Sequence, residues 1–110
     1  MKSPEEIVHL MMDKDAFSQW LNVEIVELGV GYAKLKSVLH SDMLNGFEII
    51  HGGISYSLSD SALAFASNSH GFKCVSIETS ISHIRPAHVG DVLYITSKEI
   101  YRGKSFGIYT

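Results

Sequence analysis

The stretch NGFEIIHGGISYSLSD, Asn45 to Asp60, decides the fold prediction. Two glycines follow a histidine and begin a run whose apolar members recur at helical spacing. The run continues through SALAFASNSHG, where Asn68 to Gly71 provide a glycine stop. The pattern predicts one long helix over about 53–69 that opens on a double glycine and carries a single carboxylate, Asp60.

One face of this helix is predicted to pack on a sheet, because a turn of about 100° per residue brings its apolar side chains together. Those side chains are Ile54, Leu58, Ala62, Phe65 and Ala66. Asp60 falls on nearly the opposite face, which carries mainly small or uncharged side chains: Tyr56, Ser57, Leu63, Ala64 and Ser67. A second chain or a ligand could therefore approach the helix closely around Asp60.

Gly53 lies at almost the same azimuth as Asp60 and about 10 Å from it along the helix axis. The first N–H groups of a helix are unpaired, and a glycine lets a substrate approach them, so Gly53 suits an oxyanion site. A carboxylate and an oxyanion donor that act on one carbonyl must both lie within about 3 Å of it, or one water away. We therefore infer a dimer in which two antiparallel copies of the helix share a site.

Two plainer interpretations stay open at this point. The double glycine after His51 could simply mark a loop. Asp60 could be a solvated residue, or it could bond to one of the nearby hydroxyls of Ser57, Ser59 and Ser61.

The flanking sequence predicts an α+β domain with an antiparallel sheet. Ser3-Pro4 begins a helix over about 4–20 with a break near Asp13 to Asp15. Alternating segments predict strands over 23–29, 32–39, 73–84, 91–101 and 105–110. The last strand stops abruptly at Thr110 and would leave an open edge, so we expect the C-terminal strands to be truncated in this sequence.

Length and composition limit the class of protein. The 110 residues suit a single domain, 1–110, with 45% hydrophobic and 19% charged residues. A net charge of −3 without a basic run argues against non-specific nucleic-acid binding. The sequence shows no apolar signal segment and no apolar run of about 18 residues, so neither export nor a membrane span is expected. The lone Cys74 fits a reducing compartment, and we predict a cytoplasmic protein.

Four motifs carry a resemblance that covers about 16–110. Asn45-Gly46, the His51-Gly52-Gly53 triplet, SLSDSALAFA and IRPAHVGD, in this order, resemble the hotdog-fold acyl-CoA thioesterases of the PaaI-like family. The resemblance implies a long central helix wrapped by an antiparallel sheet. It also implies a homodimer, commonly paired into a dimer of dimers, and hydrolysis of an acyl-CoA to the free acid and coenzyme A. No cofactor is implied, since coenzyme A is part of the substrate.

The resemblance also implies roles for matching positions. Gly53 corresponds to the residue whose N–H polarises the thioester carbonyl, and Asp60 to the carboxylate that attacks it or activates water. Asn45 resembles the asparagine that orients the carboxylate or water from the facing subunit, and His51 is expected to position the carbonyl or the loop. The implied substrate-binding residues are Ser76, Arg85, Gly103, Lys104 and Ser105.

Other assignments remain as alternatives. The chain could be a non-catalytic acyl-CoA-binding or regulatory hotdog module, or a hotdog hydratase or dehydratase. The latter is ranked low because His51 precedes the helix and Asp60 occupies the thioesterase position. No metal is expected, because His83 and His88 straddle Arg85-Pro86 without a nearby Cys or carboxylate cluster.

Overall fold

The computed structural model describes residues 1–110 as three α-helices, a 3₁₀ turn and four strands. The helices are α1 (Pro4–Lys14), α2 (Ala16–Trp20) and α3 (Gly52–Asn68), and the 3₁₀ turn is η1 (Ser41–Met43). The strands are β1 (Glu24–Gly29), β2 (Tyr32–Val38), β3 (Val92–Arg102) and β4 (Gly107–Tyr109). The predicted central helix is confirmed and begins and ends one residue earlier than expected.

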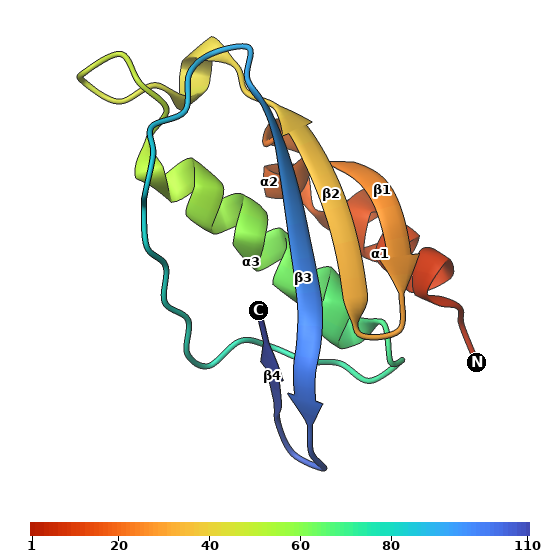
Figure 1. The fold of residues 1–110 in the computed structure, drawn as a ribbon. Helices are drawn as coiled ribbons and strands as arrows, with labels where there is room; N and C mark the ends of the chain where they lie inside the picture. Colours follow the sequence, from red (N-terminus) through yellow and green to blue (C-terminus); the bar gives the residue numbers. More distant parts are fainter.

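The four strands form one antiparallel sheet in the order β1-β2-β3-β4. Figure 1 shows α3 crossing one face of this sheet, with α1 and α2 beside it on the same face. The β1–β2 hairpin turns at Val30 and at Gly31, whose φ of +72° favours glycine. This is the hotdog architecture expected from the motifs, with a long central helix against an antiparallel sheet.

The core lies between α3 and the sheet. The helix buries the five predicted apolar residues and also Ser61. Two apolar clusters result, one around Phe65 with Leu35 and Val8, the other around Leu58 with Leu21 and Leu39. The face that carries Asp60 is left outside both clusters, so the predicted division of the helix into two faces is confirmed.

The N-terminal helix breaks where the sequence indicated. Ser3 accepts a hydrogen bond from the Glu6 N–H, and Glu6 accepts one from the Ser3 N–H, which together make a capping box before Pro4. The helix ends at Lys14, and Asp15 then caps α2 by accepting a hydrogen bond from the Ser18 N–H. The break therefore places Asp15, which is half-buried, at the N-terminus of α2.

The predicted strand over 73–84 is wrong. Residues 73–84 form no strand, and Val75 and Ile77 are 81% and 90% exposed. Figure 1 shows this segment running back along α3, outside the sheet that ends at β4. Alternating side chains favour a sheet surface, but a strand also needs a hydrogen-bonding neighbour, and no strand of the chain lies beside this segment.

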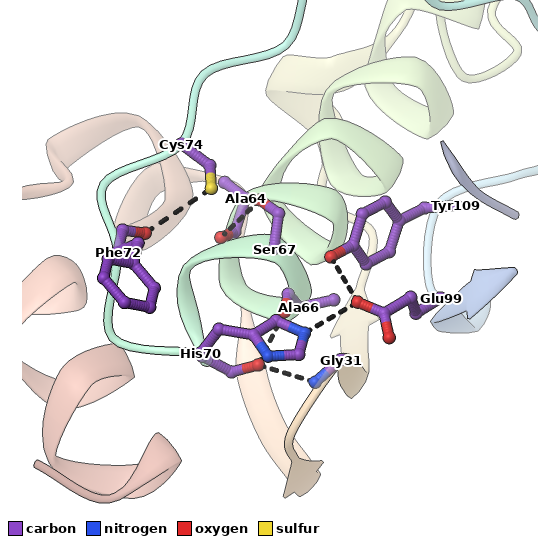
Figure 2. Close-up of polar contacts among 10 residues, drawn as sticks. Gly31, Ala64, Ala66, Ser67, His70, Phe72, Cys74, Glu99 and Tyr109 are labelled. Atoms are coloured by element: carbon purple, nitrogen blue, oxygen red, sulfur yellow. Dashed lines mark hydrogen bonds and ion pairs between the residues drawn. The ribbon is translucent and has the colours of Figure 1, made fainter. Parts of the chain in front are cut away.

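A polar cluster ties the end of α3 to β3 and β4. Figure 2 shows the Glu99 carboxylate between two donors: His70 Nε2 lies 2.6 Å from Oε1, and the Tyr109 hydroxyl donates to the same oxygen at 2.9 Å. The Gly31 N–H donates to the Ser69 hydroxyl at 2.7 Å, which adds the β1–β2 turn to the cluster. Three chain segments that are distant in the sequence are therefore joined around one carboxylate.

The cluster shifts two pKa values. Burial raises the pKa of Glu99, but the hydrogen bonds from His70 and Tyr109, with the positive charges of His70 and Arg102, outweigh it and leave the pKa lowered. Burial, the hydrogen bond to Glu99 and the charge of that carboxylate raise the pKa of Tyr109 to about 12.

The fold should therefore lose stability both at low pH and at high pH. Glu99 has a lower pKa folded than unfolded, so its contribution is present above about pH 4.5 and is lost as the pH falls below this value. Tyr109 has a higher pKa folded than unfolded, so its contribution is present below about pH 10 and is lost as the pH rises toward 12. Urea unfolding across the pH range should show both losses.

Tyr109→Phe directly tests the expected loss of stability at high pH. It should lower the free energy of unfolding at pH 7 by about 1–2 kcal/mol, because the Glu99 carboxylate loses one donor. It should also remove the loss of stability between about pH 10 and 12. Tyr101→Phe is the matched control, since Tyr101 is an exposed tyrosine of β3. If Tyr109→Phe loses as much stability between about pH 10 and 12 as the unmodified chain, this account is contradicted.

Candidate active site at the exposed face of the central helix

The first turn of α3 is exposed and presents backbone N–H groups. Gly52 and Gly53 begin the helix, and both are exposed, as is the preceding His51. The His51 side chain caps the helix, because its Nδ1 accepts the Gly53 N–H at 2.9 Å. The N–H that the sequence assigned to a substrate carbonyl is thus held by an imidazole in this chain, so a carbonyl must displace His51 to reach it.

A side chain at either glycine would crowd a neighbouring histidine. A Cβ at Gly53 would lie 3.0 Å from His51 Nδ1. A Cβ at Gly52 would lie 3.2 Å from Cε1 of His83, which the fold brings over the start of α3. The sequence analysis considered His83 only as a metal ligand. No sequence signal places it here, because its segment has no regular structure that would fix where it runs.

Asp60 opens onto a groove of about 390 Å³ on the outer face of α3. The helix contributes Asp60 together with four small or uncharged residues: Tyr56, Ser57, Ser61 and Ala64. The α1–α2 junction contributes Asp15, Phe17 and Ser18, and the returning segment contributes Ser76 and Thr79. A hydrogen bond between the hydroxyls of Tyr56 and Thr79 ties that segment to α3. Ser76, which the resemblance implies as a substrate-binding residue, therefore lines the same groove as Asp60.

Gly53 and Asp60 do not meet within one chain. Seven residues of regular helix separate them, which is about 10 Å along the axis, and both lie on the exposed side of α3. One carbonyl cannot be within hydrogen-bond reach of both.

Asn45 lies in the loop that leads into α3. Its Oδ1 accepts the N–H groups of Phe47 at 2.8 Å and Ile49 at 3.4 Å, which shapes the tight turn over 45–49. The turn brings Leu44 and Ile50 into a β-bridge and so delivers His51 to the start of the helix. The side-chain oxygen Oδ1 of Asn45 is therefore occupied by hydrogen bonds within the loop, whereas its side-chain nitrogen Nδ2 makes no hydrogen bond within the chain.

The remaining predicted substrate-binding residues do not line the groove beside Asp60. Arg85 is exposed in the returning segment. Gly103, Lys104 and Ser105 form the turn between β3 and β4, closed by a 2.8 Å hydrogen bond from the Gly103 N–H to the Phe106 carbonyl. Figure 1 shows this turn and the start of α3 at opposite ends of the molecule. One chain therefore does not gather these residues and Asp60 into one site.

Sequence reasoning missed the groove residues at the α1–α2 junction, among them the polar Asp15 and Ser18. An Asp three residues before a Ser is a recognisable helix-cap pattern, but nothing local shows that the cap faces α3. The structure contains no group of three or more His, Cys, Asp or Glu side chains placed to hold a metal ion. None of its helices is long and apolar enough to cross a membrane.

Comparison with known proteins assigns the family. The family model described as "Thioesterase superfamily" matches residues 47–110, which includes the HGG triplet, Asp60 and the β3–β4 turn. The acyl-coenzyme A thioesterase PaaI of Escherichia coli K12 is 36% identical over 101 residues, which are 92% of this chain and 72% of that protein. The chain belongs to the thioesterase superfamily.

One further relative of this thioesterase-superfamily chain, and one solved structure, agree with that assignment. A putative esterase of Archaeoglobus fulgidus is 37% identical over 105 residues, or 96% of this chain and 68% of that protein. The solved structure of the E. coli PaaI protein from the phenylacetic acid degradation operon superposes with a TM-score of 0.93 at 34% identity. That superposition covers 96% of this chain and 77% of the other, so the hotdog fold is shown over nearly the whole thioesterase chain.

Proposed function

We propose that this protein is an acyl-CoA thioesterase that hydrolyses an acyl-CoA to the free acid and coenzyme A. The observation that carries the proposal is the exposed face of α3, which presents a backbone N–H at Gly53 and a carboxylate at Asp60 beside a groove. The names of the relatives, acyl-CoA thioesterase and putative esterase, support it. The acyl group is aryl-acetyl or a short to medium chain.

The reaction uses one polarised carbonyl and one carboxylate. The thioester oxygen accepts the Gly53 N–H at the positive end of α3, which stabilises the charge that develops on it. In one route Asp60 takes a proton from water, the hydroxide adds to the carbonyl carbon, and the C–S bond breaks to release the thiolate. In the other route Asp60 itself adds to the carbon, the C–S bond breaks to release the thiolate, and water then hydrolyses the resulting anhydride to the free acid and the Asp60 carboxylate.

His51 and Asn45 prepare the two ends of this site. In the free chain His51 Nδ1 accepts the Gly53 N–H at 2.9 Å, and it releases this N–H when the substrate carbonyl binds. Until then the imidazole keeps water from binding to the N–H. Asn45 has its Oδ1 committed to the loop, which aims its Nδ2 for donation to the carboxylate or the attacking water.

The active site is shared between two copies of the chain. Because Gly53 and Asp60 lie about 10 Å apart on one helix, the Gly53 of one chain works with the Asp60 of its partner in a homodimer. Dimers pair further into a dimer of dimers. This arrangement also brings the groove residue Ser76 close to a second chain.

Coenzyme A binds along exposed residues outside the groove. Arg85 and Lys104 supply positive charge for its phosphates, Ser105 supplies a hydroxyl donor, and Gly103 belongs to the turn that carries Lys104 and Ser105. No metal and no further cofactor is needed, and the single exposed Cys74 fits a cytoplasmic location.

Release of free thiol from a panel of acyl-CoAs tests the function. Phenylacetyl-CoA and straight-chain acyl-CoAs of increasing length should release coenzyme A, with Asp13→Ala, which lies on the exposed face of α1, as active as the unmodified chain. Hydration of an enoyl-CoA without thiol release would indicate a hydratase. Tight binding of acyl-CoA without any reaction would indicate a binding module.

A further inference from the structure

The groove beside Asp60 contains a second carboxylate, which the function above does not use. Asp15 lies half-buried at the α1–α2 junction and lines the groove together with Asp60. Its Oδ1 accepts the Ser18 N–H at 2.9 Å and its Oδ2 accepts the Ser18 hydroxyl at 2.5 Å. Both of its oxygens are thus fixed by one neighbour, so the negative charge has a defined position at the groove wall.

The hydroxyl of Ser18 extends this charge to α3. Ser18 Oγ lies 2.7 Å from Ser61 Oγ, and the two serines are 1% and 8% exposed. Because the Ser18 proton is directed to Asp15, the proton between the two serines must come from Ser61. The bonds therefore run one way, from Ser61 through Ser18 to Asp15, and the groove wall next to Asp60 presents oxygen lone pairs.

No positive charge balances the two carboxylates in the groove. Its ten lining residues include Asp15 and Asp60, five serine or threonine residues, one tyrosine and two apolar residues, but no Lys, Arg or His. A ligand group that carries a negative charge would meet like charge here and would lose its hydration on entry. An uncharged group would meet hydroxyls and the apolar side chains of Phe17 and Ala64.

We propose that Asp15 is a specificity-determining residue, which excludes acyl groups that end in a carboxylate and so restricts the enzyme to uncharged acyl groups. The proposal rests on the thioesterase function above, with the groove holding the acyl group. Asp15 does not act on the thioester bond. It sets which acyl groups can lie beside Asp60.

The test compares two acyl-CoAs of nearly equal shape, glutaryl-CoA, which ends in a carboxylate, and 5-methylhexanoyl-CoA, which ends in an isopropyl group. The unmodified enzyme should show a kcat/KM at least about 10-fold higher for the uncharged substrate. Asp15→Asn should reduce this ratio by about 10-fold, mainly through glutaryl-CoA. Raising the ionic strength should reduce the ratio more in the unmodified enzyme than in Asp15→Asn, and a purely structural role for Asp15 would not produce this difference.

Two variants separate charge from packing. Asp13→Asn makes the same charge change two residues earlier, in α1, where the side chain is 60% exposed and pairs with His9, and should leave the ratio unchanged. Ser18→Ala keeps both carboxylates but removes the hydroxyl that donates to Asp15, so it should reduce the preference for the uncharged substrate less than Asp15→Asn does. Equal use of both substrates, or a ratio insensitive to Asp15→Asn and to salt, would overturn the proposal. If neither substrate is hydrolysed by the unmodified chain, the proposed function fails as well.

Discussion

Asp60→Ala should lower kcat for acyl-CoA hydrolysis by about 10³-fold or more, with KM changed by less than about threefold. The loss falls on kcat because, in the proposed mechanism, the carboxylate acts on the carbonyl or the water, whereas other residues bind coenzyme A. The fold should remain intact, since Asp60 is exposed and makes no hydrogen bond or ion pair within the chain. Thiol release and urea unfolding of the same preparation measure both effects.

Two variants serve as controls for Asp60→Ala: the same substitution at another aspartate, and a substitution of Asp60 that keeps the size of its side chain. Asp13→Ala removes an exposed carboxylate from α1 and should leave kcat unchanged. Asp60→Asn keeps the size of the side chain and should be as inactive as the alanine variant. An acyl-enzyme trapped on Asp60 in rapid quenching would identify the nucleophilic route. Full activity in Asp60→Asn would remove Asp60 from the chemistry altogether.

Gly53→Pro should lower kcat by about 10²–10³-fold, because proline has no N–H to offer the thioester oxygen. Proline suits this position, since the first turn of a helix has no backbone acceptor for that N–H. Gly52 before it has no Cβ to clash with the ring, although the ring displaces the His51 imidazole, whose Nδ1 lies 2.9 Å from the Gly53 nitrogen. The helix should therefore form, and circular dichroism should show unchanged helix content while thiol release is nearly lost.

Gly53→Ala is the matched variant that keeps the N–H. The added Cβ would lie 3.0 Å from His51 Nδ1, so the imidazole must shift and its hydrogen bond to the helix must lengthen. We expect an intermediate loss of kcat, smaller than that of Gly53→Pro. If alanine and proline cost the same activity, the effect is steric and the N–H does not bind the carbonyl.

The central helix shows why much of the fold could be predicted from the sequence. The spacing of Ile54, Leu58 and Phe65 fixes one buried face, and the double glycine and the glycine stop fix its ends to within one residue. The break at Asp15 and the β1–β2 hairpin were predicted for the same reason. In each case the signal is local, carried by caps, turns and side-chain period.

What could not be predicted depends on contacts between distant segments. Val75 and Ile77 alternate with polar residues as a strand would, yet they are exposed because no neighbouring strand pairs with them. The position of His83 beside Gly52 and the line from Asp15 to Ser61 also depend on how segments meet in space. Asn45, His51 and Ser76 were named by resemblance, and the structure gives their positions while leaving their roles as proposals.

The most direct test of the shared active site is a mixture of two inactive variants. Asp60→Ala and Gly53→Pro chains, co-expressed with different tags in equal amounts, should form mixed dimers in which one site has an intact Gly53 from one chain and an intact Asp60 from the other. Random pairing makes half of the dimers mixed, with one working site of two, so thiol release should recover to about one quarter of the unmodified level. If the mixture stays as inactive as either variant although mixed dimers are isolated through both tags, Gly53 and Asp60 do not act across two chains.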